Sequence, residues 1–303
     1  MGNEDLAGAI PGQKHNNPPD ARLSASDSSF FSVFARFRKN RAAIVGFIIF
    51  ALICLACVMA PYLTKWKFNE IIIADRMTPP SQKHILGTDY LGRDLFTRLL
   101  YGGRVTLRVA LVSTVLAAVI GGAAGLAAGY HGGGVDFIIS PVLDVLASIP
   151  IILLVIVFEA VFGFGRGYFM YAMVVAGIPQ FARLVRACVM NIMGNTYIEA
   201  ARALGVGHVS VILRHVLHNI SSPLIVRFTS GVSEALLTCT ILGYLEIGIR
   251  PPNPEWGAIV HSAKGSIRTH PYMMIISCAV IVACVISLNL FGDGLRDALD
   301  PKE

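Results

Sequence analysis

The sequence predicts an all-α integral membrane protein with six transmembrane helices. Of its 303 residues, 54% are hydrophobic and only 15% are charged, whereas a soluble domain carries about 25% charged residues. The mean hydropathy is +0.64, and the apolar residues stand in long uncharged blocks instead of alternating with polar residues at helical or strand spacing. These observations exclude an ordinary water-soluble enzyme and indicate that lipid surrounds the protein.

The N-terminal part of the chain predicts a tail followed by a first span. Residues 1–35 are rich in Gly, Asn, Pro, Ser and Asp and contain no apolar run, so we expect a disordered cytoplasmic tail and not a signal peptide. Four basic residues between Arg36 and Arg41 then precede an uncharged stretch over residues 42–63. At about 1.5 Å per residue this stretch can cross a hydrocarbon core of about 30 Å, and the basic cluster holds its start in the cytoplasm.

The same criterion predicts five further spans, over residues 109–130, 145–164, 167–186, 220–244 and 271–291. The fourth contains Pro179 and is short, so we expect its end to reach Arg183 and Arg186, whose long side chains can extend to the membrane surface. Six spans place both termini on one side, which is the cytoplasm if the first helix sets the orientation. Basic residues in the segment between the first two spans oppose this assignment: Lys65, Lys67, Arg76, Lys83, Arg93, Arg98, Arg104 and Arg108.

Neither the net charge nor the cysteine content indicates a nucleic-acid partner, a disulfide framework or a redox site. The net charge of +6 needs no nucleic acid to explain it, because basic residues flank the helices of multi-span proteins. The six cysteines lie mostly inside the apolar blocks and define no disulfide framework. Cys54 and Cys57 have the C-x-x-C spacing of redox motifs, but they lie in mid-span without a basic neighbour, so packing is the favoured interpretation.

The segment between the fourth and fifth spans, residues 187–219, is too polar to lie in lipid. It nevertheless contains helix formers and aliphatic residues at helical spacing, divided by Gly205-Val206-Gly207. This pattern predicts a helix, a turn and a second helix at the cytoplasmic surface. Its apolar side chains form a patch that a partner or the helical bundle must cover.

The same segment carries a recognisable motif, Glu199-Ala200-Ala201-Arg202-Ala203-Leu204-Gly205, followed by Leu217-His218. It resembles the EAA loop of ABC importer permeases, in which Glu-Ala-Ala, three residues, Gly and a later Leu-Pro form the dock for the ATPase subunit. His218 stands where proline is usual. The resemblance implies ATPase-coupling roles for Glu199, Ala200, Ala201, Gly205 and Leu217, with Glu199 pairing with a basic group of the ATPase.

Three further motifs narrow the resemblance to the C-type permeases of dipeptide and oligopeptide importers. They are GTDYLGRD at 87–94, PEWG at 254–257 and NLFGDGLRDALDP at 289–301. The resemblance covers about residues 34–302 and implies the type I ABC importer (MetI-like) permease fold, as a multi-pass protein of the inner (plasma) membrane. Related permeases carry peptides, glutathione, nickel chelates or opines, so the substrate stays open.

The resemblance also implies the partners. They are a second, homologous permease chain that completes a heterodimer, two ATP-binding subunits and an extracytoplasmic substrate-binding protein, so this chain forms half of a translocation path. ATP and Mg are expected in the partner subunits and no cofactor in this chain. In agreement, none of the seven lysines follows a glycine, as the lysine of a phosphate-binding P-loop does.

Two sets of residues inside the spans are candidates for packing and transport. Gly121, Gly125 and Gly129 recur every four residues, and we expect this face to pack closely on a helix of the bundle or of a partner subunit. Glu159, Arg227 and Glu234 are ionisable at lipid depth and are candidates for lining the translocation path. The alternative is an interfacial position for Glu159 and Arg227.

Other functions find less support. His208, His215 and His218 lack a further ligand with clear geometry, so no metal site is expected. Ser233 precedes Glu234 and no histidine stands in a later span, so no catalytic residue is assigned. A self-sufficient secondary transporter is the remaining alternative, but it would show internal repeats with interrupted helices, which the sequence does not.

Overall fold

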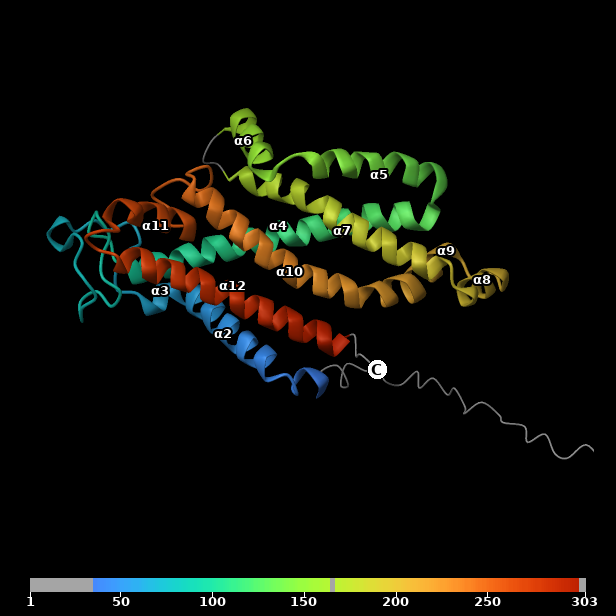
Figure 1. Cartoon of the computed structure of the whole chain (residues 1–303), viewed down its shortest axis with the longest axis horizontal. Coiled ribbons are helices and arrows are strands. Elements are labelled where there is room, and N and C mark those ends of the chain that lie inside the picture. Colours follow the sequence, from blue (N-terminus) through green and yellow to red (C-terminus); the bar gives the residue numbers. More distant parts are fainter. Residues whose placement is uncertain (1–34, 164–166, 300–303) are drawn as a thin grey trace, which may run out of the picture.

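The computed structural model describes residues 35–163 and 167–299, and helices joined by loops make up this part of the chain (Figure 1). Five helices are long and apolar enough to cross a membrane. They are α2 (Arg41–Val58), α4 (Leu95–His131), α7 (Phe169–Met193), the continuous stretch His208–Tyr244 that ends in α10 (Leu217–Tyr244), and α12 (Tyr272–Leu299). A bent pair, α5 (Gly133–Ser148) and α6 (Ile151–Phe162), makes six spans if counted as one. The predicted all-α membrane fold is therefore confirmed.

The predicted third span, residues 145–164, is wrong as a single helix. Its apolar run covers the end of α5 and all of α6, whose axes differ by 90°. Pro150 causes the break, because proline disfavours the α conformation of the residue before it, and Ile149 is extended with φ −84° and ψ 119°. Residue 164, the predicted end of this span, lies outside the described residues, as does most of the predicted tail.

Several helices begin or end beyond the apolar runs. α4 begins at Leu95, well before the predicted start, because the Asp94 carboxylate accepts the backbone N–H of Thr97 at 2.8 Å and caps the helix. The first predicted span is α2 followed by the short α3 (Ala60–Leu63), which has a proline in its first turn. α7 continues past Arg186 to Met193, and α12 continues to Leu299. Apolar length thus predicts the crossing, and the polar cap at Asp94 sets where α4 begins.

The glycine face of α4 packs on α7 inside the bundle. A Cβ atom at Gly121 would lie 2.5 Å from the carbonyl oxygen of Ile178, and one at Gly129 would lie 2.9 Å from that of Arg186. A Cβ atom at Gly125 would overlap the carbonyl oxygen of Ala182. The spacing therefore serves close approach of two helices within this chain.

The bundle has two distinct ends (Figure 1). We call one the α8 end: it carries α8 (Thr196–Ala203) and α9 (His208–Val211), and the start of α2 and the end of α12 point toward it. Asn40, which caps α2, donates to Asp297 of α12 at 3.3 Å. The opposite end, the α11 end, carries the loop over residues 64–94, the 3-10 turn Ile73–Asp75 and α11 (Trp256–Ala263), which continues into a second 3-10 turn, Lys264–Ser266.

Candidate functional site

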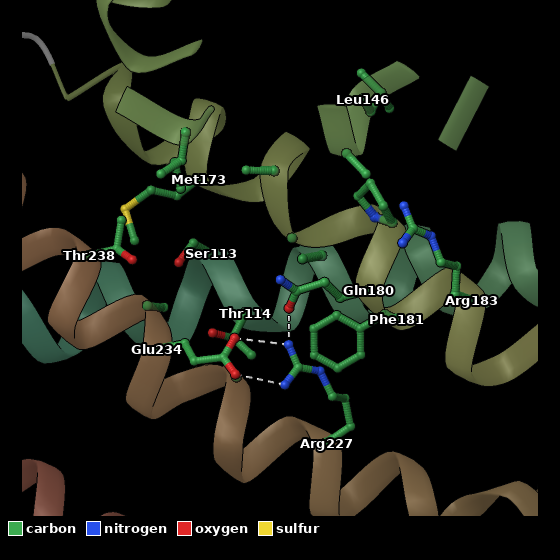
Figure 2. Close-up of a pocket in the computed structure, with 18 of the residues that line it drawn as sticks. Ser113, Thr114, Leu146, Met173, Gln180, Phe181, Arg183, Arg227, Glu234 and Thr238 are labelled. Atoms are coloured by element: carbon green, nitrogen blue, oxygen red, sulfur yellow. Dashed lines mark hydrogen bonds and ion pairs between the residues drawn. The ribbon is translucent and has the colours of Figure 1, made fainter. Parts of the chain in front are cut away.

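A pocket of about 490 Å³ opens between α4, the α5–α6 junction, α7 and α10 (Figure 2). Its volume lies in the range of small-molecule sites, which is about 300–1,000 Å³. The wall is largely apolar, with Leu146, Met173 and Phe181 among its members. The polar side chains in it are Ser113, Thr114, Gln180, Arg183, Arg227, Glu234 and Thr238.

An ion pair between Arg227 and Glu234 forms part of the pocket wall. Arg227 Nη1 lies 2.9 Å from Glu234 Oε1, and Nη2 lies 2.9 Å from Oε2, so the contact is bidentate. The two residues are seven positions apart and therefore share one face of α10. The Glu234 side chain is 55% exposed and that of Arg227 is 21% exposed. Both predicted path residues of α10 thus meet at the pocket wall.

α7 supplies two further contacts to the same guanidinium. Nη2 of Arg227 also donates to the side-chain oxygen of Gln180, and the guanidinium carbon lies 5.7 Å from the ring centroid of Phe181 (Figure 2). Gln180 is not among the residues predicted from the sequence to line a translocation path. An amide directly after Pro179 in an otherwise apolar span is the signal that could have identified it.

Glu159 does not line this pocket. It is fully buried near the end of α6, where its Oε1 accepts the backbone N–H of Phe169 at 3.0 Å. Phe169 begins α7, so this carboxylate joins α6 to α7. The prediction that Glu159 lines the same path as Arg227 and Glu234 has no support in this arrangement.

The EAA-like segment forms a folded surface at the α8 end. Ile198 of α8, Val211 of α9, and Val216 and Ile220 beyond it are buried against Val185, Val189 and Ile192 of α7. Between α9 and α10 the chain makes a π-helical turn, Ile212–Val216, and continues without a break. His218, which stands where the resemblance predicts a proline, therefore lies in the first turn of α10 and inside the continuous helical stretch His208–Tyr244.

The residues predicted to couple to a partner lie on the outer face of this segment. Glu199 and Ala200 are exposed, Leu217 is 38% exposed, and Gly205 ends α8 with φ +81°, a conformation that favours glycine. The side chain of Ala201 lies outside the described part of the structure. The most exposed apolar side chains of the segment are Leu204 at 85%, Val209 at 70% and Leu213 at 59%. These apolar side chains of the segment have no cover within the described part of the chain.

Histidines of this segment serve as side-chain contacts. Nδ1 of His208 lies 2.6 Å from the hydroxyl of Tyr130 at the end of α4. The ring of His215 lies 6.1 Å from that of Tyr197, centroid to centroid. Across residues 35–163 and 167–299, no group of three or more His, Cys, Asp or Glu side chains is placed to hold a metal ion.

The GTDYLGRD motif folds into a network of buried charges at the α11 end. Asp89 Oδ2 accepts from Arg93 Nε at 2.6 Å and lies 3.6 Å from Nε of Arg98, and all three side chains are at most 8% exposed. His84, also buried, lies 2.9 Å from the Asp94 carboxylate. The motif therefore orders this loop and the start of α4.

The PEWG motif completes the α11 end. Glu255 caps α11 by accepting the N–H of Ala258 at 2.9 Å, and it accepts the hydroxyl of Thr106 at 3.0 Å. Burial raises the pKa of Glu255 to about 7, although the hydrogen bonds from Gly257, Ala258 and Thr106 act in the opposite direction. Trp256 is fully buried, and its indole N–H donates to the carbonyl of Leu99 at 2.9 Å.

Comparison with known proteins agrees with this architecture. Residues 121–303 match the family described as binding-protein-dependent transport system inner membrane component, and residues 29–80 match the N-terminal TM domain of oligopeptide transport permease C. The dipeptide transport system permease protein DppC of Alkalihalophilus pseudofirmus is 37% identical over 287 residues, or 95% of this chain and 94% of the relative. The glutathione transport system permease protein GsiD of Pectobacterium atrosepticum is 37% identical over 268 residues, or 88% of this chain and 89% of the relative.

A solved structure shares the fold. A chain of the MetNI methionine ABC transporter, in an inward-facing conformation, aligns with a TM-score of 0.56 and 22% identity. The alignment covers 67% of this chain and 96% of that one. Together with the two family matches and the relatives above, this shows that the chain belongs to the binding-protein-dependent transport system inner membrane components, as a multi-pass permease subunit of an ABC importer.

Proposed function

We propose that the chain is one of two homologous permeases in an ATP-driven importer of peptides and that its pocket forms half of the translocation path. Relatives named as dipeptide permeases, at 37% and 35% identity, support peptides as the substrate class. The glutathione permease at 37% identity supports the second candidate, glutathione, which is itself a small peptide. Nickel chelates and opines remain alternatives from the wider family.

One observation supports a coupling mechanism between α8 and α9 and the pocket. α7 and α10 line the pocket with Gln180, Arg227 and Glu234, and the same two helices bury the inner face of α8 and α9 at their ends. A displacement of α8 and α9 by a partner would therefore move the walls of the pocket directly. In our proposal, two ATPase subunits, which bind ATP and Mg, dock on the exposed outer face around Glu199 and switch the bundle from inward-open to outward-open.

The two ends of the bundle then receive different partners. The α8 end, with both termini, faces the cytoplasm and the ATPases, and the α11 end faces outward to a substrate-binding protein. The basic residues of the loop over 64–94 oppose this orientation by charge counting. Several of them are neutralised within the fold, as Arg93 is by Asp89 and Lys83 by Asp75 at 2.6 Å.

The test is charge reversal at Glu199 in the complete importer. Glu199→Arg should leave the permease folded, because the side chain is exposed, and should lower ATPase binding or ATP-driven uptake of a dipeptide at least about tenfold. Loss of one charge-assisted hydrogen bond costs about 1.5–3 kcal/mol. Glu70→Arg, which changes an exposed glutamate in the loop over 64–94 far from the proposed ATPase surface, is the control and should leave ATPase binding unchanged. Wild-type uptake in the Glu199→Arg complex would contradict the proposed coupling role.

A further inference from the structure

The ion pair in the pocket retains bonding capacity on both partners. A guanidinium has five N–H donors, and Arg227 uses three of them, two toward Glu234 and one toward Gln180. Each carboxylate oxygen of Glu234 accepts one hydrogen bond from Arg227 and has a second lone pair. The pair can therefore bind a carboxylate on one side and an ammonium on the other without breaking.

Other polar groups of the wall contribute less to charge recognition. The hydroxyls of Ser113 and Thr114 donate to the carbonyl of Ala110 within α4, at 3.2 and 2.8 Å. Arg183 is the second cation of the wall, and its guanidinium lies 3.5 Å from Asp144 of α5. Arg227, Glu234, Arg183 and Asp144 thus form two neutral pairs.

A neutral ion pair discriminates between substrates by charge. A zwitterion can lie antiparallel to the pair, so that each of its charges faces an opposite one. A substrate with a net charge has one charge more than the pair can match, and that charge is attracted by one partner of the pair and repelled by the other. The contacts from Gln180 and Phe181 hold the guanidinium in place, so the pair can act as a preformed site.

We propose that Arg227 and Glu234 form a charge-selective site that favours zwitterionic peptides of zero net charge, the substrate carboxylate binding Arg227 and the substrate ammonium binding Glu234. This inference rests on the proposed function and adds a specificity determinant within the permease. It predicts that the two partners bias selection in opposite directions when either is neutralised alone.

The experiment uses the complete importer in proteoliposomes with ATP inside and the substrate-binding protein outside. The probes are Ala-Ala, Ala-Lys and Ala-Asp, which keep free termini and differ in net charge. Initial uptake of each probe is divided by the fraction of binding protein that the probe occupies, so that the affinity of the binding protein does not enter. The readout is the ratio of Ala-Asp to Ala-Lys uptake.

Glu234→Gln should raise this ratio about tenfold, because Arg227 is left unpaired, and Arg227→Gln should lower it about tenfold; a tenfold change corresponds to about 1.4 kcal/mol. The double variant Arg227→Glu/Glu234→Arg should restore the wild-type preference for Ala-Ala. Glu70→Gln, at the α11 end, is the control and should leave the ratio unchanged.

Shifts in the same direction for both single variants, unchanged ratios, or a swapped variant that transports none of the probes would overturn the proposal. If wild-type complex shows no ATP-dependent uptake of Ala-Ala, the proposed function itself fails, and charge selection with it.

Discussion

The two ends of the bundle differ in where their motif residues lie. At the α11 end, charged side chains are buried and paired within the chain, as Asp89 is with Arg93 at 2.6 Å. At the α8 end, large apolar side chains such as Leu204, at 85% exposure, have no cover within the chain. Both ends leave large apolar side chains exposed, since Ile73 in the loop over 64–94 is 73% exposed. The difference is therefore that internal ion pairs order the motif of the α11 end, whereas the motif residue Glu199 at the α8 end lies on the surface.

α4 and α7 connect these two ends. α4 begins at the α11 end, where Asp94 caps it, and its glycine face packs along α7, which leads into α8. A rigid contact of this kind transmits displacement better than a loosely packed one, because close-packed helices have little free volume to absorb it. The same type of substitution is therefore expected to have different effects on stability and on partner binding at the two ends.

The largest effect is expected from removing the shared carboxylate at the α11 end. Asp89→Asn leaves the buried guanidiniums of Arg93 and Arg98 without their counter-ion, and removal of one partner of a buried pair costs about 3–5 kcal/mol. Thermal or denaturant unfolding of the purified permease in detergent measures the change. Glu199→Gln, an exposed carboxylate at the α8 end, should change the free energy of unfolding by less than about 0.5 kcal/mol. Equal effects of the two substitutions would remove the distinction between the ends.

A somewhat smaller effect is expected from pH, through Glu255. Burial raises its pKa from the ordinary value of 4.5 to about 7 on folding, so the folded state keeps a proton that the unfolded state releases as the pH rises. The stabilisation is complete below pH 4.5, is lost as the pH rises to about 7 and amounts to roughly 3 kcal/mol.

Glu255→Gln should flatten this dependence, because glutamine does not titrate while its side-chain oxygen can still accept the N–H of Ala258. The measurement is the difference in unfolding free energy between wild type and variant at several pH values from 4.5 to 8. Parallel curves over this range would show that Glu255 titrates with the same pKa in both states.

The smallest effect on stability is expected at the α8 end. Leu204→Ser removes an apolar side chain that is already in contact with solvent, so the free energy of unfolding should change by less than about 0.5 kcal/mol. Binding of the ATPase subunit, measured by co-purification or titration, should nevertheless weaken, because in the proposed complex this side chain contacts the ATPase. A loss of stability without a loss of ATPase binding would indicate that the patch is structural.

The apolar runs that cross the membrane and the helix–turn–helix pattern within residues 187–219 could be predicted from the sequence because both are local. An apolar run long enough to cross the membrane, or a Gly205 that ends a helix, depends on neighbouring residues only. The start of α4 at Leu95 was missed, although Asp94 is a recognisable capping residue, because the prediction followed hydropathy. Pro150 was an equally local signal, and it broke the span predicted over residues 145–164 into α5 and α6.

The candidate site could be predicted only in part. Arg227 and Glu234 share a helix face at a spacing of seven, so their proximity follows from α10 alone. The approach of Gln180 and Phe181 depends on how α7 is rotated and placed against α10, which no pattern within either segment specifies. Glu159 carries the same charge as Glu234, but it lies in α6, beyond the bend at the end of α5, and accepts the N–H of Phe169 at the start of α7.

By itself, the sequence determined that this chain crosses the membrane, roughly where its apolar runs lie and which segment is too polar to lie in lipid, because hydrophobic length acts over neighbouring residues. Only the tertiary structure decided which polar residues share a pocket, which charges neutralise one another and which apolar residues stay uncovered. These properties depend on contacts between segments far apart in the chain, such as Thr106 with Glu255, and such contacts exist only once the helices have packed.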